Sequence, residues 1–106
     1  MEFISVGYGN VVNINRVIAV AAASTAPSKR LISEAKESGR CIDVTQGRRT
    51  KAVLIMDSDH VVLSALHVGT VLVRLEAASK GIEDAFLDDD LGLYDDEDDF
   101  DDDFED

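Results

Sequence analysis

Two apolar runs near the middle of the chain, Ala52–Met56 and Val61–Leu66, constrain the fold more than any other feature of the sequence. Each has the length of a strand, and neither alternates between apolar and polar residues as a half-exposed strand does. The four residues between them, Asp57-Ser58-Asp59-His60, are typical of a tight turn. The sequence therefore predicts two buried strands in a sheet that is covered on both faces.

The rest of residues 1–82 alternates between strand and helix signals. Further strands are predicted at residues 3–6, 11–14, 16–20 and 41–44, and helices at about 25–39 and 68–79. Pro27 near the start and Gly39 at the end of the first helix are typical helix boundaries. The predicted fold class is α/β (α+β), a small mixed and largely antiparallel sheet with two helices, with Phe3 and Tyr8 in its core. Two short helices cover only part of so apolar a sheet, so we expect another subunit to cover the rest.

Charge is divided unequally along the chain. The formal net charge is −12, from 22 acidic and 10 basic residues, but 15 of the acidic residues lie from Glu83 onward and every basic residue lies before it. Residues 1–82 therefore carry a formal charge of +3 and residues 83–106 a charge of −15. Like charges repel one another in a segment without cations, so we predict one domain at 1–82 and a disordered acidic tail at 83–106.

A cluster of cations lies in the predicted turn between the strands at 41–44 and 52–56. The turn reads Gly47-Arg48-Arg49-Thr50-Lys51, and the planar guanidinium groups of Arg48 and Arg49 suit phosphate oxygens. Paired arginines at a hairpin turn are also common as plain solvated residues, so the pattern alone leaves both interpretations open. Nucleic acid is the first partner that it suggests.

Several short motifs occur together between residues 2 and 80. They are Gly7-Tyr8-Gly9-Asn10-Val11-Val12, Asn15-Arg16, Ala26-Pro27 with Lys29-Arg30, Ile42-Asp43, Gly47-Arg48-Arg49-Thr50, Met56-Asp57-Ser58-Asp59-His60-Val61 and Leu63-Ser64-Ala65. In this order and spacing they resemble the RemA family of bacterial regulators. The resemblance implies a protomer related to LytTR-type DNA-binding domains, assembled as a closed ring of eight subunits. Such a ring binds and wraps double-stranded DNA and activates genes of the extracellular (biofilm) matrix.

The resemblance also implies which side chains contact DNA. The family's DNA-contacting positions are occupied here by Arg16, Arg48 and Arg49, and secondary candidates are the cations Lys29, Arg30 and Lys51. No helix-turn-helix or zinc-finger spacing is visible, so we expect contacts to the DNA backbone and discrimination by DNA shape. The protein is then a cytoplasmic, nucleoid-associated homo-oligomer. The alternative is an oligomeric scaffold that binds protein partners through its tail and no nucleic acid.

Catalysis and metal binding have little support in the sequence. Asp57, Asp59 and His60 offer carboxylate and imidazole groups, but a turn needs such residues anyway. Gly7-Tyr8-Gly9 lacks the third glycine and the following helix of a dinucleotide-binding loop. Cys41 is the sole cysteine, which excludes an internal disulfide and suggests a buried structural thiol. We expect no enzyme, no cofactor and no metal site, and no secretion signal or membrane-spanning run is visible.

The acidic tail also contains aromatic residues and has three interpretations. The aromatic residues are Phe86, Tyr94, Phe100 and Phe104. The tail is a solvated brush that keeps the protein soluble, a mimic of DNA that competes for the arginines, or a segment that recruits a basic protein partner. If the tail competes with DNA, truncation at about Ile82 raises the affinity for DNA.

Overall fold

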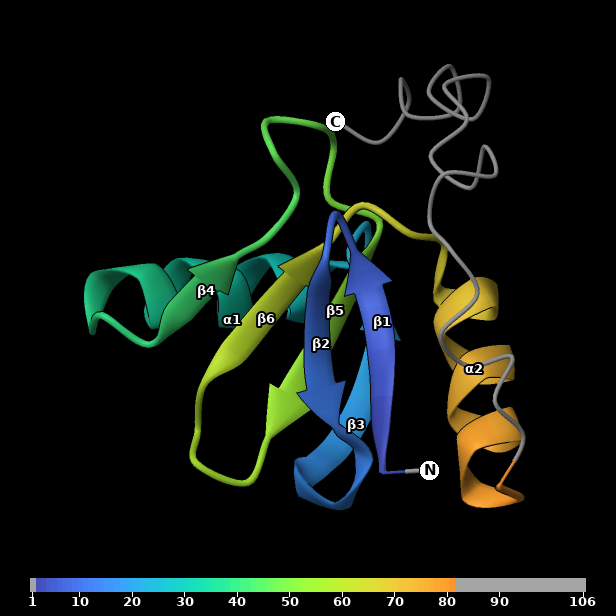
Figure 1. Cartoon of the computed structure of the whole chain (residues 1–106). Helices are drawn as coiled ribbons and strands as arrows, with labels where there is room; N and C mark the ends of the chain where they lie inside the picture. The colour runs from blue at the N-terminus through green and yellow to red at the C-terminus, as the bar shows by residue number, and fades with distance from the viewer. Residues whose placement is uncertain (1, 82–106) are drawn as a thin grey trace.

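A four-stranded sheet forms the centre of the computed structural model, which describes residues 2–81 (Figure 1). Its strands, in spatial order, are β3 (Val17–Ala22), β5 (Ala52–Met56), β6 (Val61–Ser64) and β4 (Cys41–Asp43). β5 runs antiparallel to both of its neighbours, whereas β4 pairs in parallel with β6. All of β6 and the first three residues of β5 are buried, which confirms the two buried strands predicted from the apolar runs.

A separate two-stranded sheet lies across one face of this central sheet. β1 (Phe3–Gly7) pairs antiparallel with β2 (Asn10–Asn13), and Figure 1 shows this hairpin in front of β5. Residues 7–9 have φ angles of 112°, 55° and 81°. Glycine adopts such angles at low cost, which explains the two glycines of the turn. The side-chain amide of Asn10 closes the turn by donating hydrogen bonds to two of its carbonyls, at 3.0 and 3.2 Å.

The two helices begin and end where the sequence predicts. α1 (Ala26–Glu37) starts after Thr25, whose hydroxyl accepts a hydrogen bond from the Ser28 N–H at 3.2 Å. The helix is followed by Gly39 at a φ of 77°, a typical C-terminal signal. α2 (Val68–Ser79) matches its predicted bounds. Neither helix is long and apolar enough to cross a membrane, and no other helix of residues 2–81 is.

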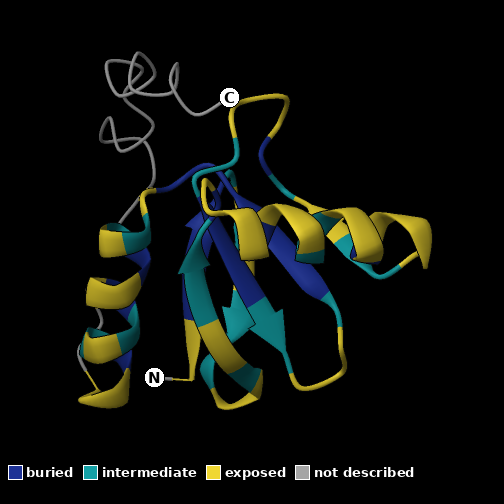
Figure 2. Ribbon diagram, turned by 180° about the vertical axis from the view of Figure 1, so that it is seen from behind, coloured by how far each residue is buried: buried dark blue, intermediate teal, exposed yellow. Residues whose placement is uncertain are grey.

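The helices cover opposite faces of the central sheet (Figures 1 and 2). On one face the hairpin and α2 form a core with β5 and β6, made of Ile4, Val6, Ala52, Leu54, Val62, Leu66, Val71 and Ala78. On the other face α1 contributes to a second cluster, made of Ala23, Ala35, Val53, Val61 and Leu63. The hairpin therefore supplies, from the same chain, much of the cover that we expected from another subunit.

Buried polar groups tie the hairpin to its neighbours. Arg74 of α2 is only 5% exposed, and its Nη1 donates a hydrogen bond to the Ser5 carbonyl at 3.0 Å. The hydroxyl of Ser64, which is fully buried in β6, donates to the Val6 carbonyl at 2.9 Å. Hydrogen-bonding groups in the core are costly to leave unpaired, so these bonds fix how the hairpin lies on the sheet and on α2.

Two details of the prediction are wrong. Phe3 is 42% exposed and Tyr8 is half-buried at positive φ, so neither is a core residue as we expected. The strands that flank Arg48 and Arg49 do not form a hairpin, because β6 lies between β4 and β5. Because β4 pairs in parallel with β6, the segment between β4 and β5 is a loop that crosses the end of β6.

Candidate nucleic-acid interface

The loop of residues 44–51 carries Arg48 and Arg49 between β4 and β5. Both ends of the loop are attached to β6, since the backbone N–H groups of Val44 and Lys51 donate hydrogen bonds to β6 carbonyls at 3.1 and 2.8 Å. Between these anchors the loop projects beyond the end of the sheet (Figure 1). Arg48 and Arg49 are both exposed there.

Asp43 and Thr45 shape the first turn of this loop. The Asp43 carboxylate accepts hydrogen bonds from the Thr45 hydroxyl at 2.7 Å and from the Thr45 N–H at 2.9 Å. These two bonds lower the pKa of the Asp43 carboxyl, and the bond from the Thr45 side chain has the larger effect. Thr45 is 2% exposed, and its carbonyl accepts from the Arg48 N–H at 3.0 Å. Gln46 and Gly47 follow at φ angles of 56° and 82°, which reverses the chain just before the arginines.

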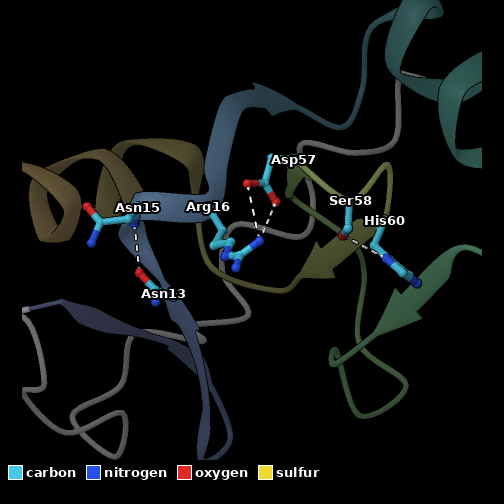
Figure 3. A network of polar contacts seen from close by, with 6 residues as sticks. All are labelled: Asn13, Asn15, Arg16, Asp57, Ser58 and His60. Atoms are coloured by element: carbon cyan, nitrogen blue, oxygen red, sulfur yellow. Dashed lines mark hydrogen bonds and ion pairs between the residues drawn. The ribbon is translucent and has the colours of Figure 1, made fainter.

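Arg16 lies at the end of the short helix η1 (Ile14–Arg16) and pairs with Asp57 in the β5–β6 turn (Figure 3). Its Nη1 is 3.4 Å from Oδ1 and 3.5 Å from Oδ2 of Asp57. The two side chains are 64% and 42% exposed, so water screens the ion pair, and such pairs contribute at most about 1 kcal/mol. The Arg16 guanidinium can therefore exchange this carboxylate for another anion at low cost.

Within one protomer the predicted arginines do not form a single site. Arg16 directly precedes Val17, the first residue of β3, which pairs with Met56 at the end of β5. Arg48 and Arg49 lie shortly before Ala52, the first residue of β5. Lys51 and Asp57, which flank β5, are six residues apart, or about 20 Å at the rise of an extended strand. The three arginines therefore lie at two separate places, at opposite ends of the sheet.

The secondary candidates lie at the loop end of the sheet. The Ala23 N–H donates a hydrogen bond to the Lys51 carbonyl at 3.1 Å, which places the start of α1 beside the start of β5. The first turns of α1 carry Lys29 and Arg30, both exposed. Together with Arg48 and Arg49, this end of the sheet carries five cations from the loop and from α1.

The β5–β6 turn has the geometry of a structural turn. Ser58 Oγ and His60 Nδ1 are 2.8 Å apart in an exposed position (Figure 3), and Asp59 adopts a φ of 74°. Asp57 is bound to Arg16, through its carboxylate and through its backbone N–H, and not to the imidazole of His60. Among residues 2–81 no group of three His, Cys, Asp or Glu side chains is arranged to hold a metal ion.

Cys41 is half-buried at the start of β4, against the core cluster under α1. Burial raises the pKa of its thiol, and the positive charge of Lys36 partly opposes this effect. A thiol that stays protonated is a poor nucleophile. The predicted structural role agrees with this environment, although the side chain is less buried than we expected.

Two contacts that shape the interface were missed by sequence reasoning. Arg16 and Asp57 are 41 residues apart, and nothing in their spacing connects them. Asp43 and Thr45 did carry a signal, because an aspartate often caps the backbone two residues further along. The sequence prediction contains only the end of a strand at these residues.

The fold and these positions define a small α+β protein with arginines at both ends of one sheet. The chain belongs to the RemA-like family, described as extracellular matrix regulatory protein A-like, which matches residues 3–75. This confirms the family resemblance found in the sequence, and the match ends before the acidic residues from 83 onward.

Relatives in several bacteria are about half identical to this chain. Proteins of Carboxydothermus hydrogenoformans and Geobacillus kaustophilus are 55% and 53% identical over 75 residues, which cover 71% of this chain and 86% of each relative. A protein of Acetivibrio thermocellus is 48% identical over 89 residues, covering 84% of this chain and 94% of its own length. The names of all three describe candidate regulatory proteins. The chain is therefore similar to proteins named for regulation.

Proposed function

We propose that this protein is a transcription regulator that binds the phosphates of double-stranded DNA through Arg16, Arg48 and Arg49. The observation that carries the proposal is the loop of residues 44–51, which presents two adjacent arginines on a backbone attached to β6 at both ends. Guanidinium groups bind phosphate with two parallel hydrogen bonds, and an anchored loop loses little freedom on binding. Lys29 and Arg30 on α1 extend the cationic surface at the same end.

Assembly is part of the proposal, because one protomer offers few contacts. Its arginines reach the duplex at two points, separated by at least the length of β5, which releases only a few counterions. A closed ring, of eight subunits as the family resemblance implies, repeats both points around its circumference. After the first contact the others become intramolecular, so DNA that follows the ring is bound tightly and wrapped. A variant that cannot assemble should lose DNA binding with every arginine in place.

Contacts of this kind fix the position of a duplex but read little sequence. We therefore propose that DNA shape and flexibility select the binding sites, with genes of the extracellular matrix as the first targets to test. Footprinting on upstream regions of such genes measures this preference. Repeated protected segments of similar shape support it, whereas uniform protection of unrelated DNA contradicts it.

Salt dependence of binding tests the function itself. Fluorescence anisotropy of a labelled duplex is measured with the wild-type protein at about 50 and about 200 mM salt, a range in which phosphate contacts lose much of their affinity. The regulator is expected to bind at low salt and much more weakly at high salt. The matched control is Lys80→Ala, which removes an exposed cation directly after α2 that is paired with Glu76 at 3.3 Å. If Lys80→Ala loses as much affinity as Arg48→Ala, overall charge and not the named arginines governs binding.

The acidic segment at residues 83–106 lies outside the described residues, but its charge of −15 gives it a role in the proposal. We propose that it competes with DNA for the arginines. The last described residues, at the end of α2, lie at the end of the sheet that carries Arg16 (Figure 1). Truncation after Ile82 should raise DNA affinity and steepen its salt dependence. Unchanged affinity of the truncated protein excludes this competition.

A second function has support in the composition of the same segment. Its aromatic residues among carboxylates are typical of segments that bind basic proteins, and in this case the assembled protein is a scaffold. The isolated segment 83–106 would then retain a basic protein partner on a column, and the full-length protein would leave a duplex unbound at any salt concentration.

A further inference from the structure

An apolar groove lies between β2 of the hairpin and the edge strand β4. It has a volume of about 340 Å³, and its walls include Met56 of β5. Val11 and Ile42 stand on opposite sides of it and are 49% and 45% exposed. Ser58 and His60 of the β5–β6 turn are also part of its lining. Exposed aliphatic side chains around a groove indicate a surface that a partner covers.

A ridge of matching character lies on α2. Leu72 and Val73 are 49% and 66% exposed on the side of the helix that faces away from the sheet. One turn earlier is Gly69, where nothing lies within 4 Å of the place a Cβ would take, and one turn later is the exposed carboxylate of Glu76. A helix with such a short apolar stripe is suited to lie in a groove.

The groove and the ridge lie on opposite flanks of the molecule. α2 contacts β1 and β3, whereas the groove lies beside β2 and β4 at the far edge of the sheet (Figure 1). One molecule therefore cannot place its own ridge in its own groove. We propose that the α2 ridge of one copy docks in the β2–β4 groove of the next copy, head to tail. Contacts of this type repeat from copy to copy and close into a ring when the rotation permits.

Charge complementarity favours a second copy as the occupant. Arg40, directly before β4, donates hydrogen bonds to neutral oxygens, the Asp59 carbonyl and the Ser38 hydroxyl, both at 2.6 Å. No carboxylate is among the side chains that line the groove in the described part of the chain. On the ridge, Glu76 forms an exposed ion pair with Lys80, and the two side chains are 68% and 63% exposed. Such a contact is weak, so the carboxylate can turn to the cation beside the groove of the next copy.

This inference rests on the assembly in the proposed function and names its two surfaces. It predicts that damage to either surface produces monomers. Ile42→Asp places a charge at the groove and Val73→Asp places one on the ridge; both positions are exposed, so the protomer should still fold. The matched control is Ile18→Asp on β3, which is 65% exposed and belongs to neither surface. If Ile42→Asp fails to fold, Val11→Asp replaces it at the opposite wall.

The experiment measures molar mass by size-exclusion chromatography with light scattering, on the full chain without DNA. Wild-type protein and Ile18→Asp should be assembled, and Ile42→Asp and Val73→Asp should each be monomeric. A mixture of the two monomeric variants then decides the geometry, because each retains the surface that the other has lost. At a concentration where both alone are monomers, an equal mixture should reach twice the monomer mass and no more.

Four results would overturn the inference: a monomeric wild type, an unchanged mass for Ile42→Asp or Val73→Asp, dissociation of the Ile18→Asp control, or a mixture that stays monomeric. The masses are measured without DNA, so they are independent of DNA affinity. An assembled protein that behaves as described but ignores a duplex would contradict the DNA-binding function and leave the contact intact.

Discussion

Arg16 and Asp57 hold each other through both backbone and side chain. The Asp57 N–H donates a hydrogen bond to the Arg16 carbonyl at 2.8 Å, and Arg16 Nη1 lies 3.4 Å from Oδ1 of the carboxylate (Figure 3). The backbone bond positions the arginine at the end of the sheet. The Asp57 carboxylate is paired with the guanidinium that we propose as a DNA contact, so a DNA phosphate must displace the carboxylate.

Replacing Asp57 with asparagine should therefore strengthen DNA binding. An exposed ion pair of this kind is worth roughly 0.2–1 kcal/mol, which corresponds to a gain of about 1.4- to fivefold in affinity. The backbone bond remains, so thermal stability should change little. Glu34→Gln is the control, because it removes the same charge from an exposed position on α1. An equal gain in both variants, measured by anisotropy, would assign the effect to net charge.

The Asp43 cap predicts a loss of stability that depends on pH. Asp43→Ala leaves the buried Thr45 hydroxyl and N–H without this acceptor, which should cost about 1–3 kcal/mol in the free energy of unfolding at pH 7. The pKa of Asp43 is lowered in the folded protein, so its stabilising effect is present above the ordinary carboxyl pKa and is lost as pH falls through the folded value. The difference between wild type and variant should shrink below about pH 4.

Urea denaturation at pH 7 and at acidic pH measures this difference. Asp43→Asn keeps one acceptor oxygen without the charge and should lie between the two proteins at pH 7. The same loop carries Arg48, so Asp43→Ala should also weaken duplex binding. A constant difference in stability across the pH range would contradict the role of the ionised carboxylate.

Removing the buried arginine of α2 should loosen the hairpin. Arg74→Met keeps the apolar stem but removes the hydrogen bond that Arg74 donates to the Ser5 carbonyl, at a cost of about 1–3 kcal/mol. Hydrogen exchange of β1 should accelerate more than that of β5. Lys80→Met, at an exposed position of the same chain region, is the control and should change neither. Equal acceleration in β1 and β5 would indicate general destabilisation instead.

The helices and strands and their order along the chain were largely predictable, whereas the pairing of the strands in the sheet was not. Apolar runs identified β5 and β6, and Thr25, Pro27 and Gly39 marked α1, because local spacing and capping determine these elements. The parallel pairing of β4 with β6 depends on contacts between distant residues. That pairing converted a predicted hairpin into a crossing loop. The packing of the first hairpin, as a separate sheet across one face, depends on such distant contacts as well.

The candidate site shows the same limit. The exposure of Arg48 and Arg49 followed from the turn residues around them. Their separation from Arg16 follows from the direction of β5, which the sequence does not display. The three arginines were expected to form one surface, but in each protomer they lie at opposite ends of the sheet.

Gly47 tests whether the shape of the loop matters for its arginines. Its φ is 82° and nothing lies within 4 Å of the place of a Cβ, so Gly47→Ala acts through backbone strain and not through a clash. We expect a loss of about 1 kcal/mol in stability and weaker duplex binding. Gln46→Gly is the control, since Gln46 already adopts a φ of 56° that glycine accepts. Unchanged DNA affinity in Gly47→Ala would show that the arginines act independently of the loop conformation.

The central claim is that arginines at both ends of the sheet, repeated by assembly, bind duplex DNA. Its most direct measurement combines light scattering with duplex anisotropy for wild type, Arg16→Ala and Arg48→Ala in one buffer. The assembled mass should stay the same in all three proteins. Each arginine variant should bind at least about tenfold more weakly, with a shallower dependence on salt, because each lost charged hydrogen bond contributes about 1.5–3 kcal/mol. Normal DNA affinity in both variants at unchanged mass would contradict the claim.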